Sequence, residues 1–161
     1  MLNVGSSKTR VALLRFSNTA EIEFYFNQYS TVAEYESAIQ QMASHYVGGN
    51  TNTTGGLYIG RTQLFSPSNG ARTDVPLKIA IVVTDGQATV EAENLSLQAN
   101  SLKAVASVMA IGVTSAVDDT TLKIIATDNN VYRVENFAAL QGSALIRQLT
   151  VGVCDNSVIK K

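Results

Sequence analysis

Two short segments carry the oxygen atoms that a hard metal ion would need. The first is Thr84-Asp85-Gly86-Gln87, in which a carboxylate follows directly on an apolar run. The second is the glycine-rich segment Gly48–Gly56, which brings three hydroxyls, from Thr51, Thr53 and Thr54. Carboxylate and hydroxyl oxygens are the hard ligands that Mg²⁺ and Mn²⁺ prefer. The two segments together predict a divalent cation site, provided that the fold brings them together.

Each segment also has a purely structural interpretation. Asp is common in turns and caps, so Asp85 could cap the next element, and Gly86 would let the chain turn sharply after it. One of the three Thr could N-cap a helix that begins near Gly55. A nucleotide-binding loop is not indicated, because the glycine-rich segment lacks both Gly-Lys-Ser/Thr and G-x-G-x-x-G.

Apolar runs predict the strands that position these segments. The run before Asp85 is largely β-branched and unbroken, which is typical of a strand covered on both faces. The segment Ile22–Phe26 lies in an alternating pattern, which is typical of an edge strand. The predicted strands are Val11–Phe16, Ile22–Phe26, Leu77–Thr84, Val105–Ile111 and Val131–Val134.

Helical periodicity lies between these runs. Apolar residues recur at helical spacing over Val32–Met42 and Ala92–Leu102, and again from Phe137 to Leu145. Asp119–Ala126 predicts a short helix capped by Asp118 or Asp119. Strands that alternate with helices predict an α/β fold with a mostly parallel sheet, whose ligands bind beyond the carboxyl ends of the strands. Asp85 is expected at that edge.

Length and charge narrow the class of protein. The chain has 161 residues, 45% of them hydrophobic, which suffices for one domain with a sizeable core. A net charge of -1 gives no basic field for nucleic acid, and no apolar run reaches the roughly 20 residues of a membrane helix. A single Cys and a single His exclude a multi-cysteine zinc site and a two-histidine site within the chain. The first residues show no secretory signal pattern.

The order of the motifs resembles a von Willebrand factor type A domain. The motifs are Thr9–Ser17, Gly48-Gly49-Asn50-Thr51-Asn52-Thr53, Ile81–Gly86 and Ala110–Val113. They are most similar to the extracellular-matrix branch of that family, such as the modules of collagen VI and the matrilins, and the resemblance covers about Val4 to Cys154. It implies a Rossmann-like, doubly wound, mostly parallel sheet with one antiparallel edge strand, here Ile22–Phe26.

The resemblance also implies a metal-ion-dependent adhesion site. In the family this site holds Mg²⁺ or Mn²⁺ with Asp-x-Ser-x-Ser after the first strand, one Thr of the glycine-rich loop and the Asp of Thr-Asp-Gly. Thr51 would be the direct hydroxyl ligand, Asp85 would act through water or on the far side of the metal, and an acidic residue of the partner would complete the coordination. The ligand-binding face would comprise Gly49, Asn50, Thr51, Asn52, Asp85 and Gly86.

The sequence departs from the family at its start. The first strand, the Asp-x-Ser-x-Ser loop and the first helix do not appear, and Met1–Ala20 contains no Asp or Glu. Asp155–Ile159 is not a relocated copy, because Ile159 stands where the last Ser should be. We therefore expect an N-terminally truncated fold, with residues 1–154 as a partial domain and 155–161 as a C-terminal tail.

This departure has three expected consequences. The lost strand is central in the family's sheet, so a gap should open between Val11–Phe16 and Leu77–Thr84. Metal binding in this chain should be weak or absent, because only Thr51 and Asp85 remain of the family's side-chain ligands. The gap should also favour self-association, since it uncovers ladder groups and apolar side chains.

Three further residues could take part in function. His45 follows a helical pattern, and we interpret it as solvent-facing or capping, because no catalytic partners are visible. Asn94-Leu95-Ser96 matches the N-glycosylation pattern at a helix start. Asn52 matches it too, but a glycan there would block the metal face. By the resemblance, Cys154 is one half of a disulfide whose partner would precede the first strand; a free thiol without a role is the alternative.

Three functions are compatible with these observations. The first is a non-catalytic adhesion or protein-binding module of a secreted, extracellular protein, whose partner is a matrix or cell-surface protein such as a collagen. The second is an intracellular type A domain that serves as an assembly scaffold. The third, an enzyme on a Rossmann-like sheet, would need a nucleotide loop or a nucleophile with its base, and neither appears. Nucleic acid and membrane insertion are not expected in any of the three.

Overall fold

The computed structural model describes residues 4–5, 7–45 and 48–155. Its strands are β1 (Leu13–Phe16), β2 (Ala20–Phe24), β3 (Ile79–Thr84), β4 (Ser107–Val113) and β5 (Val131–Val134). Its α-helices are α1 (Val32–Gln41), α2 (Thr53–Ile59), α3 (Leu95–Lys103), α4 (Asp119–Ile125) and α5 (Ser143–Asp155). Every predicted strand is found with its ends displaced by no more than two residues, so the apolar runs identified the strands correctly.

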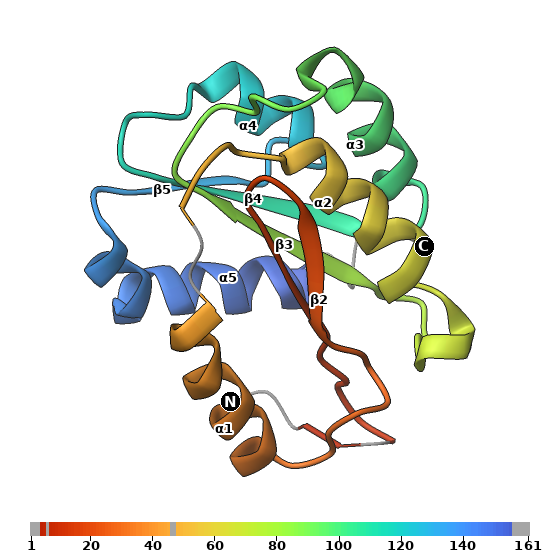
Figure 1. The fold of residues 1–161 in the computed structure, drawn as a ribbon. Helices are drawn as coiled ribbons and strands as arrows, with labels where there is room; N and C mark the ends of the chain where they lie inside the picture. Colours follow the sequence, from red (N-terminus) through yellow and green to blue (C-terminus); the bar gives the residue numbers. More distant parts are fainter. Residues whose placement is uncertain (1–3, 6, 46–47, 156–161) are drawn as a thin grey trace.

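A parallel sheet with the order β3-β4-β5 forms the centre of the molecule. In β4 the residues from Val108 to Val113 are all buried, as expected for a central parallel strand with helices on both faces. Figure 1 shows α2, α3 and α4 on one face of this sheet and α5 on the other. This is the doubly wound α/β architecture that the alternation of strands and helices predicts.

The main core lies between the sheet and the helices α2, α3 and α4. Val82 of β3 and Val108 and Ala110 of β4 point into it. The helices contribute apolar side chains at helical spacing, namely Leu57 from α2, Leu95, Ala99 and Leu102 from α3, and Leu122 and Ile125 from α4. The packing therefore fixes α2 and the carboxyl ends of β3 and β4 relative to one another, and these are the elements that carry the two motifs.

The strands β1 and β2 form a separate antiparallel pair and do not join the three-stranded sheet. The expectation of one sheet containing all five strands is therefore wrong. The break falls between β1 and β3, where the sequence predicts a gap. The hairpin is held to the molecule through α2 instead: Phe16 packs against the core, and a Cβ added to Gly56 would come within 2.9 Å of its ring.

Several side chains that the sequence pattern assigns to buried faces are exposed. Ile81 and Val83 of β3 are 48% and 39% exposed, whereas Val82 between them is buried. On α1, Val32 and Ile39 are 49% and 52% exposed, and only Tyr35 of that stripe is deeply buried. One face of β3 and much of the apolar stripe of α1 thus lack a covering layer within the described residues.

Two predicted helices begin or end differently from the expectation. The last helical segment is interrupted at Gly142, which separates the 3₁₀ turn η5 (Phe137–Gln141) from α5. The helix after the glycine-rich segment begins at Thr53 and continues into the π-turn η2 (Gly60–Leu64). The short 3₁₀ turns η1 (Met42–His45), η3 (Pro67–Asn69) and η4 (Ala92–Asn94) complete the described elements.

None of the helices in the described part of the chain is long and apolar enough to cross a membrane.

Candidate functional site

The glycine-rich segment runs into α2 and is capped by Asn52. The Asn52 side-chain oxygen accepts a hydrogen bond from the Gly55 backbone N–H at 2.8 Å, which satisfies one of the free donors of the first helical turn. The alternative that one of the three Thr caps this helix is therefore wrong, because Asn52 is the N-cap. The Asn52 amide also donates to the Asn18 carbonyl at 3.0 Å, so the same side chain links the helix start to the turn between β1 and β2.

The turn between β1 and β2 holds this segment in place. Asn50 donates its backbone N–H to the Asn18 side-chain oxygen at 3.0 Å, and Asn52 donates its backbone N–H to the Ser17 carbonyl at 2.8 Å. Gly49 has a φ of +139°, and a Cβ there would lie 2.7 Å from the Asn18 side chain, so the contact requires glycine. Asn18 was not predicted from the sequence; the polar Ser17-Asn18-Thr19 turn between two strands is the signal that could have found it.

Two reciprocal hydrogen bonds join the glycine-rich segment to the segment after β3. The Thr51 backbone N–H donates to the Thr89 hydroxyl at 2.9 Å, and the Thr89 backbone N–H donates to the Thr51 carbonyl at 3.0 Å. Nearby, the Thr54 hydroxyl donates to the Glu91 carbonyl at 3.1 Å. The two motifs, more than 30 residues apart in the chain, are thus one structural unit. No pattern in the sequence pointed to Thr89.

Asp85 lies at the exposed carboxyl end of β3, at the edge where ligands bind in such sheets. The buried Thr84 shapes the turn, since its hydroxyl donates to the Gly86 carbonyl at 3.1 Å. The Thr51 hydroxyl lies beside this turn, 3.1 Å from where a Cβ of Gly86 would stand. The Asp85 carboxylate makes no hydrogen bond or ion pair within the described residues. The cap interpretation of Asp85 therefore finds no support here.

The oxygen atoms at this site are of the kind that a hard divalent cation prefers as ligands. They are too few to complete its coordination. Asp85 and Thr51 offer one carboxylate and one hydroxyl, whereas Mg²⁺ needs a near-octahedral set of oxygens. At the start of α2, the Thr53 hydroxyl is buried and lacks a hydrogen-bond partner among the described residues. Such an orphaned polar atom costs free energy, so it marks a place for a further polar group. Across the described residues, no three His, Cys, Asp or Glu side chains come together.

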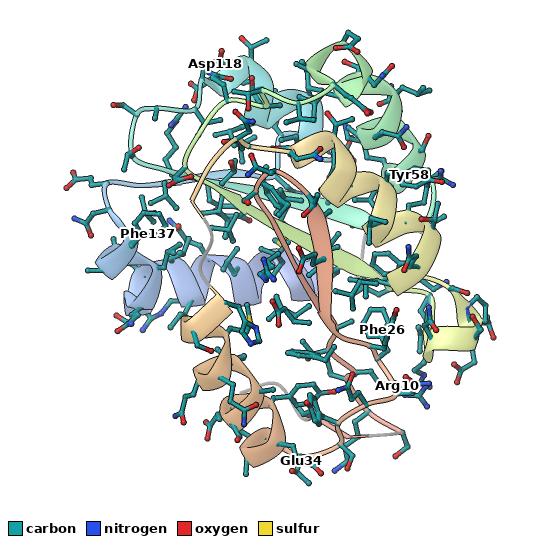
Figure 2. All side chains as sticks on the ribbon, viewed as in Figure 1. Arg10, Phe26, Glu34, Tyr58, Asp118 and Phe137 are labelled. Atoms are coloured by element: carbon teal, nitrogen blue, oxygen red, sulfur yellow. The ribbon has the colours of Figure 1, made fainter. Side chains whose placement is uncertain are left out.

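A second hydrogen-bond network borders the site. The Thr121 hydroxyl of α4 donates to the Gln87 side-chain oxygen at 2.7 Å, which ties the Asp85 loop to α4. Asp118 caps α4 by accepting the Thr121 backbone N–H at 2.6 Å, and this bond lowers the pKa of the Asp118 carboxyl. Asp118 is therefore a helix cap, as predicted. Figure 2 shows it beside α4 at one end of the molecule.

His45 and Asn94, two of the other candidate residues in the described part of the chain, make no hydrogen bond to Thr51 or Asp85. His45 is exposed and its Nδ1 lies 2.9 Å from Glu23 Oε2 on β2, so it faces solvent as predicted, with an acidic partner that the sequence did not reveal. Asn94 stands at the N-terminal end of α3, and its side chain makes no capping hydrogen bond. Cys154 falls within α5, but its side chain lies outside the described residues.

Sequence comparison identifies relatives of this chain among matrix proteins of several animals. The chain is 29% identical to the collagen alpha-6(VI) chain of Mus musculus over 160 residues, which are 98% of this chain and 7% of that one. It is 34% identical to cuticlin-6 of Caenorhabditis elegans, covering 95% of this chain and 25% of the relative. Matrilin-1 of Gallus gallus is 33% identical, with 87% and 28% covered. The chain thus spans less than a third of the length of each of these relatives.

Solved structures show the same fold. Proximal thread matrix protein 1 from the mussel byssus superposes with a TM-score of 0.82 at 29% identity, covering 94% of this chain and 37% of that one. A second structure of that protein, described as having a zinc-occupied MIDAS motif, has a TM-score of 0.78 at 30% identity and covers 89% of this chain and 36% of that one. The sequence profile of the von Willebrand factor type A domain matches residues 1–146. This chain belongs to the von Willebrand factor type A domain family.

Proposed function

We propose that this chain is a non-catalytic binding module of an extracellular-matrix protein, and that it contacts its partner through the face formed by Gly49, Asn50, Thr51, Asn52, Asp85 and Gly86. The partner would be a matrix or cell-surface protein such as a collagen. The observation that carries the proposal is the Thr51–Thr89 pair of hydrogen bonds. These bonds place a hydroxyl next to the turn that bears the unpartnered Asp85 carboxylate.

A divalent cation, Mg²⁺ or Mn²⁺, would link the face to an acidic side chain of the partner. Asp85 would supply the negative charge and Thr51 a hydroxyl ligand, which is the chemistry that such ions prefer. The chain alone offers too few oxygens, so we expect weak or absent metal binding until a further segment adds a carboxylate and hydroxyls. The buried, unpartnered Thr53 hydroxyl is consistent with such a segment, which could hydrogen bond to it.

Catalysis has no support in the arrangement of the described residues. An enzyme of this fold would need a nucleophile and a base near Asp85. The one histidine, His45, instead contacts Glu23 of β2. We therefore keep the binding function and propose no reaction.

Calorimetric titration with Mn²⁺ tests the metal site. We compare the chain as given with a form extended by an upstream strand that ends in Asp-x-Ser-x-Ser. The given chain should bind weakly or not at all, and the extended form should bind Mn²⁺ and, through it, an immobilised matrix protein. Asp85→Ala in the extended form should abolish both, whereas Glu36→Ala, which removes an exposed carboxylate on α1, should change neither. Micromolar binding by the given chain, lost in Thr51→Ala, would show that the two residues suffice and that the expected truncation is wrong.

We also propose Asn94 as a glycan acceptor and Cys154 as half of a disulfide. Asn94 is partly exposed and free of a capping bond, which leaves its amide available for modification. Asn52, the other match to the pattern, uses both ends of its amide in hydrogen bonds. Mass spectrometry of the secreted parent protein checks both: an unmodified Asn94 together with a free Cys154 thiol would favour the intracellular scaffold.

A further inference from the structure

The loop after β3, residues 85–89, is held from two sides at the carboxyl edge of the sheet. Its last residue, Thr89, exchanges two hydrogen bonds with Thr51, at 2.9 and 3.0 Å. Its middle residue, Gln87, accepts a hydrogen bond from the Thr121 hydroxyl of α4 at 2.7 Å. The position of Asp85, the first residue of the loop, therefore depends on the glycine-rich segment and on α4, two elements that are remote in the chain.

The contact of Gln87 with α4 is part of a polar cluster. Gln87 and Thr121 are both partly buried, so their hydrogen bond is only partly exposed to competition from water. The Thr121 backbone N–H is the main cause of the lowered pKa of the Asp118 carboxyl, and the side chains of Thr121 and Gln87 lower that pKa further. The three side chains thus favour one arrangement, in which the loop lies against the first turn of α4.

The first turn of α4 is a firm support for this contact. Arg133 of β5 donates to the Val117 carbonyl at 2.6 Å and to the Asp119 carboxylate at 2.7 Å. The side chains of Val117 and Leu122 are fully buried. These hydrogen bonds and core contacts fix the start of α4 against the sheet, so the Thr121 hydroxyl is held at a defined point.

The backbone at Asp85 needs such a contact to be fixed in place. Gly86 follows Asp85 directly and has no side chain to restrict its backbone. The Thr84 hydroxyl donates to the Gly86 carbonyl at 3.1 Å, which sets the shape of the turn but not its position relative to α4. Mg²⁺ requires oxygen ligands held in near-octahedral geometry, and hydrogen bonds that orient the ligands commonly contribute about 10–100-fold to metal affinity.

We propose that Gln87 is a positioning residue of the ligand-binding face and that Thr121 acts through it. The Thr121–Gln87 hydrogen bond holds the loop so that the Asp85 carboxylate and the Thr51 hydroxyl can share one cation. This inference rests on the proposed metal-dependent function and extends it to α4, which carries none of the proposed ligands. A change at Thr121, 34 residues from Gln87 in the chain, should therefore alter binding at the face.

Nitrogen-15 relaxation of the chain as given tests the positioning directly. Thr121→Val removes the hydroxyl, and we expect lower order parameters for the amides of Asp85 and Gly86. Thr121→Ser keeps the hydroxyl and should restore the parent values. The matched control is Thr62→Val on η2: the partly buried Thr62 also makes a 2.7 Å hydroxyl hydrogen bond, to the Tyr58 carbonyl, and α2 separates it from the glycine-rich segment. This control should leave both amides unchanged.

Titration of Mn²⁺ into the extended form, with its upstream Asp-x-Ser-x-Ser strand, then measures the consequence for the metal. Thr121→Val should weaken Mn²⁺ binding by about tenfold, whereas Thr121→Ser and Thr62→Val should stay within about twofold of the parent form. If the parent extended form binds no Mn²⁺, the proposed function itself fails. If it binds and Thr121→Val binds as tightly, or if the order parameters of the loop do not change, Gln87 is not a positioning residue.

Urea unfolding of each variant separates this effect from a general loss of stability. Equal loosening of the loop in Thr62→Val would overturn the proposal in favour of a general effect of losing one hydroxyl. Where Thr121→Val fails to fold, Gln87→Ala takes its place, because it removes the acceptor from the loop and leaves α4 unchanged. It should reproduce the lower order parameters and the weaker Mn²⁺ binding, and parent values in either measurement would overturn the proposal.

Discussion

Two aspartates show how differently this chain uses a carboxylate. Asp74 accepts hydrogen bonds from Nε and Nη2 of Arg72, whereas Asp85 projects from the end of β3 without a partner in the described chain. A paired carboxylate has its charge satisfied within the fold. The negative charge of an unpaired carboxylate next to a hydroxyl is available to bind a ligand. This contrast, more than the Thr-Asp-Gly motif alone, supports a binding role for Asp85.

The Asp74–Arg72 pair predicts a measurable pH dependence. The Arg72 hydrogen bonds lower the pKa of the Asp74 carboxyl from 3.8 to about 2. Because the pKa is lower in the folded chain, the pair stabilises the fold above pH 3.8, and this contribution is lost as the pH falls toward 2. Carboxyl-carbon NMR should show Asp74 titrating near pH 2, and Arg72→Gln should return its pKa toward 3.8. An unchanged Asp74 titration in Arg72→Gln would refute the pairing.

At the same scale, the sequence predicted only the residues that belong to motifs. Thr51 and Asp85 were predicted as ligands, and Asp118 or Asp119 as a cap, because local chemistry or the family resemblance marks them; of these, the Asp118 cap is confirmed. Asn18 and Thr89, which hold the glycine-rich segment in position, were not predicted. Their roles depend on contacts between segments more than 30 residues apart, and single-residue types carry no record of such contacts. The Glu23 contact of His45 escaped prediction because it, too, joins two separate segments of the chain.

At the scale of elements, hydrogen bonds at helix starts decide how firmly the motifs are held. Asn52 caps α2 and also bridges to the β1–β2 turn, so one side chain joins two elements. Asn94 occupies the corresponding position of α3 but makes no capping bond. The two asparagines can therefore be compared directly: both occupy an N-cap position, but only the Asn52 side chain accepts a capping hydrogen bond.

We expect Asn52→Ala to lower the free energy of unfolding by about 1–2 kcal/mol, because the Gly55 donor loses its partner and the link to Asn18 is broken. Asn94→Ala should change it by less than about 0.5 kcal/mol. Urea unfolding followed by circular dichroism measures both. Equal effects of the two substitutions would show that the Asn52 hydrogen bonds do not stabilise the domain.

The apolar runs predicted every strand, and their alternation with helices predicted the parallel sheet, because buried strands must be apolar on both faces. The stripe on α1 shows the limit of such patterns. Val32, Tyr35 and Ile39 lie at helical spacing, yet Val32 and Ile39 are exposed. A pattern identifies the face that needs covering. Whether a covering element is present is a property of the rest of the fold.

At the scale of the whole molecule, two sheets share one set of helices without pairing with each other. The β1–β2 hairpin is attached mainly through Phe16 and α2, while β3 offers an unpaired edge and two exposed apolar side chains within the described structure. Ile79–Thr84 contains no charged residue, and such a strand edge is a template for pairing with another chain. Net domain stability is only about 5–15 kcal/mol, and a backbone group that is buried without a partner costs about 1–3 kcal/mol, so even a few such groups at this edge would matter.

We therefore expect the chain to self-associate through this uncovered part of β3 as its concentration rises. Val83→Lys should shift the chain toward monomer, because a charged side chain at a strand edge blocks pairing and β3 has no charge of its own. Leu97→Lys is the matched control: Leu97 on α3 is 61% exposed, against 39% for Val83, but lies away from β3. It should leave association unchanged, which sedimentation velocity over a concentration series can measure. Melting curves verify that both variants fold. A soluble monomer that melts cooperatively at every concentration, or an equal response to the two substitutions, would show that the open edge of β3 does not drive association.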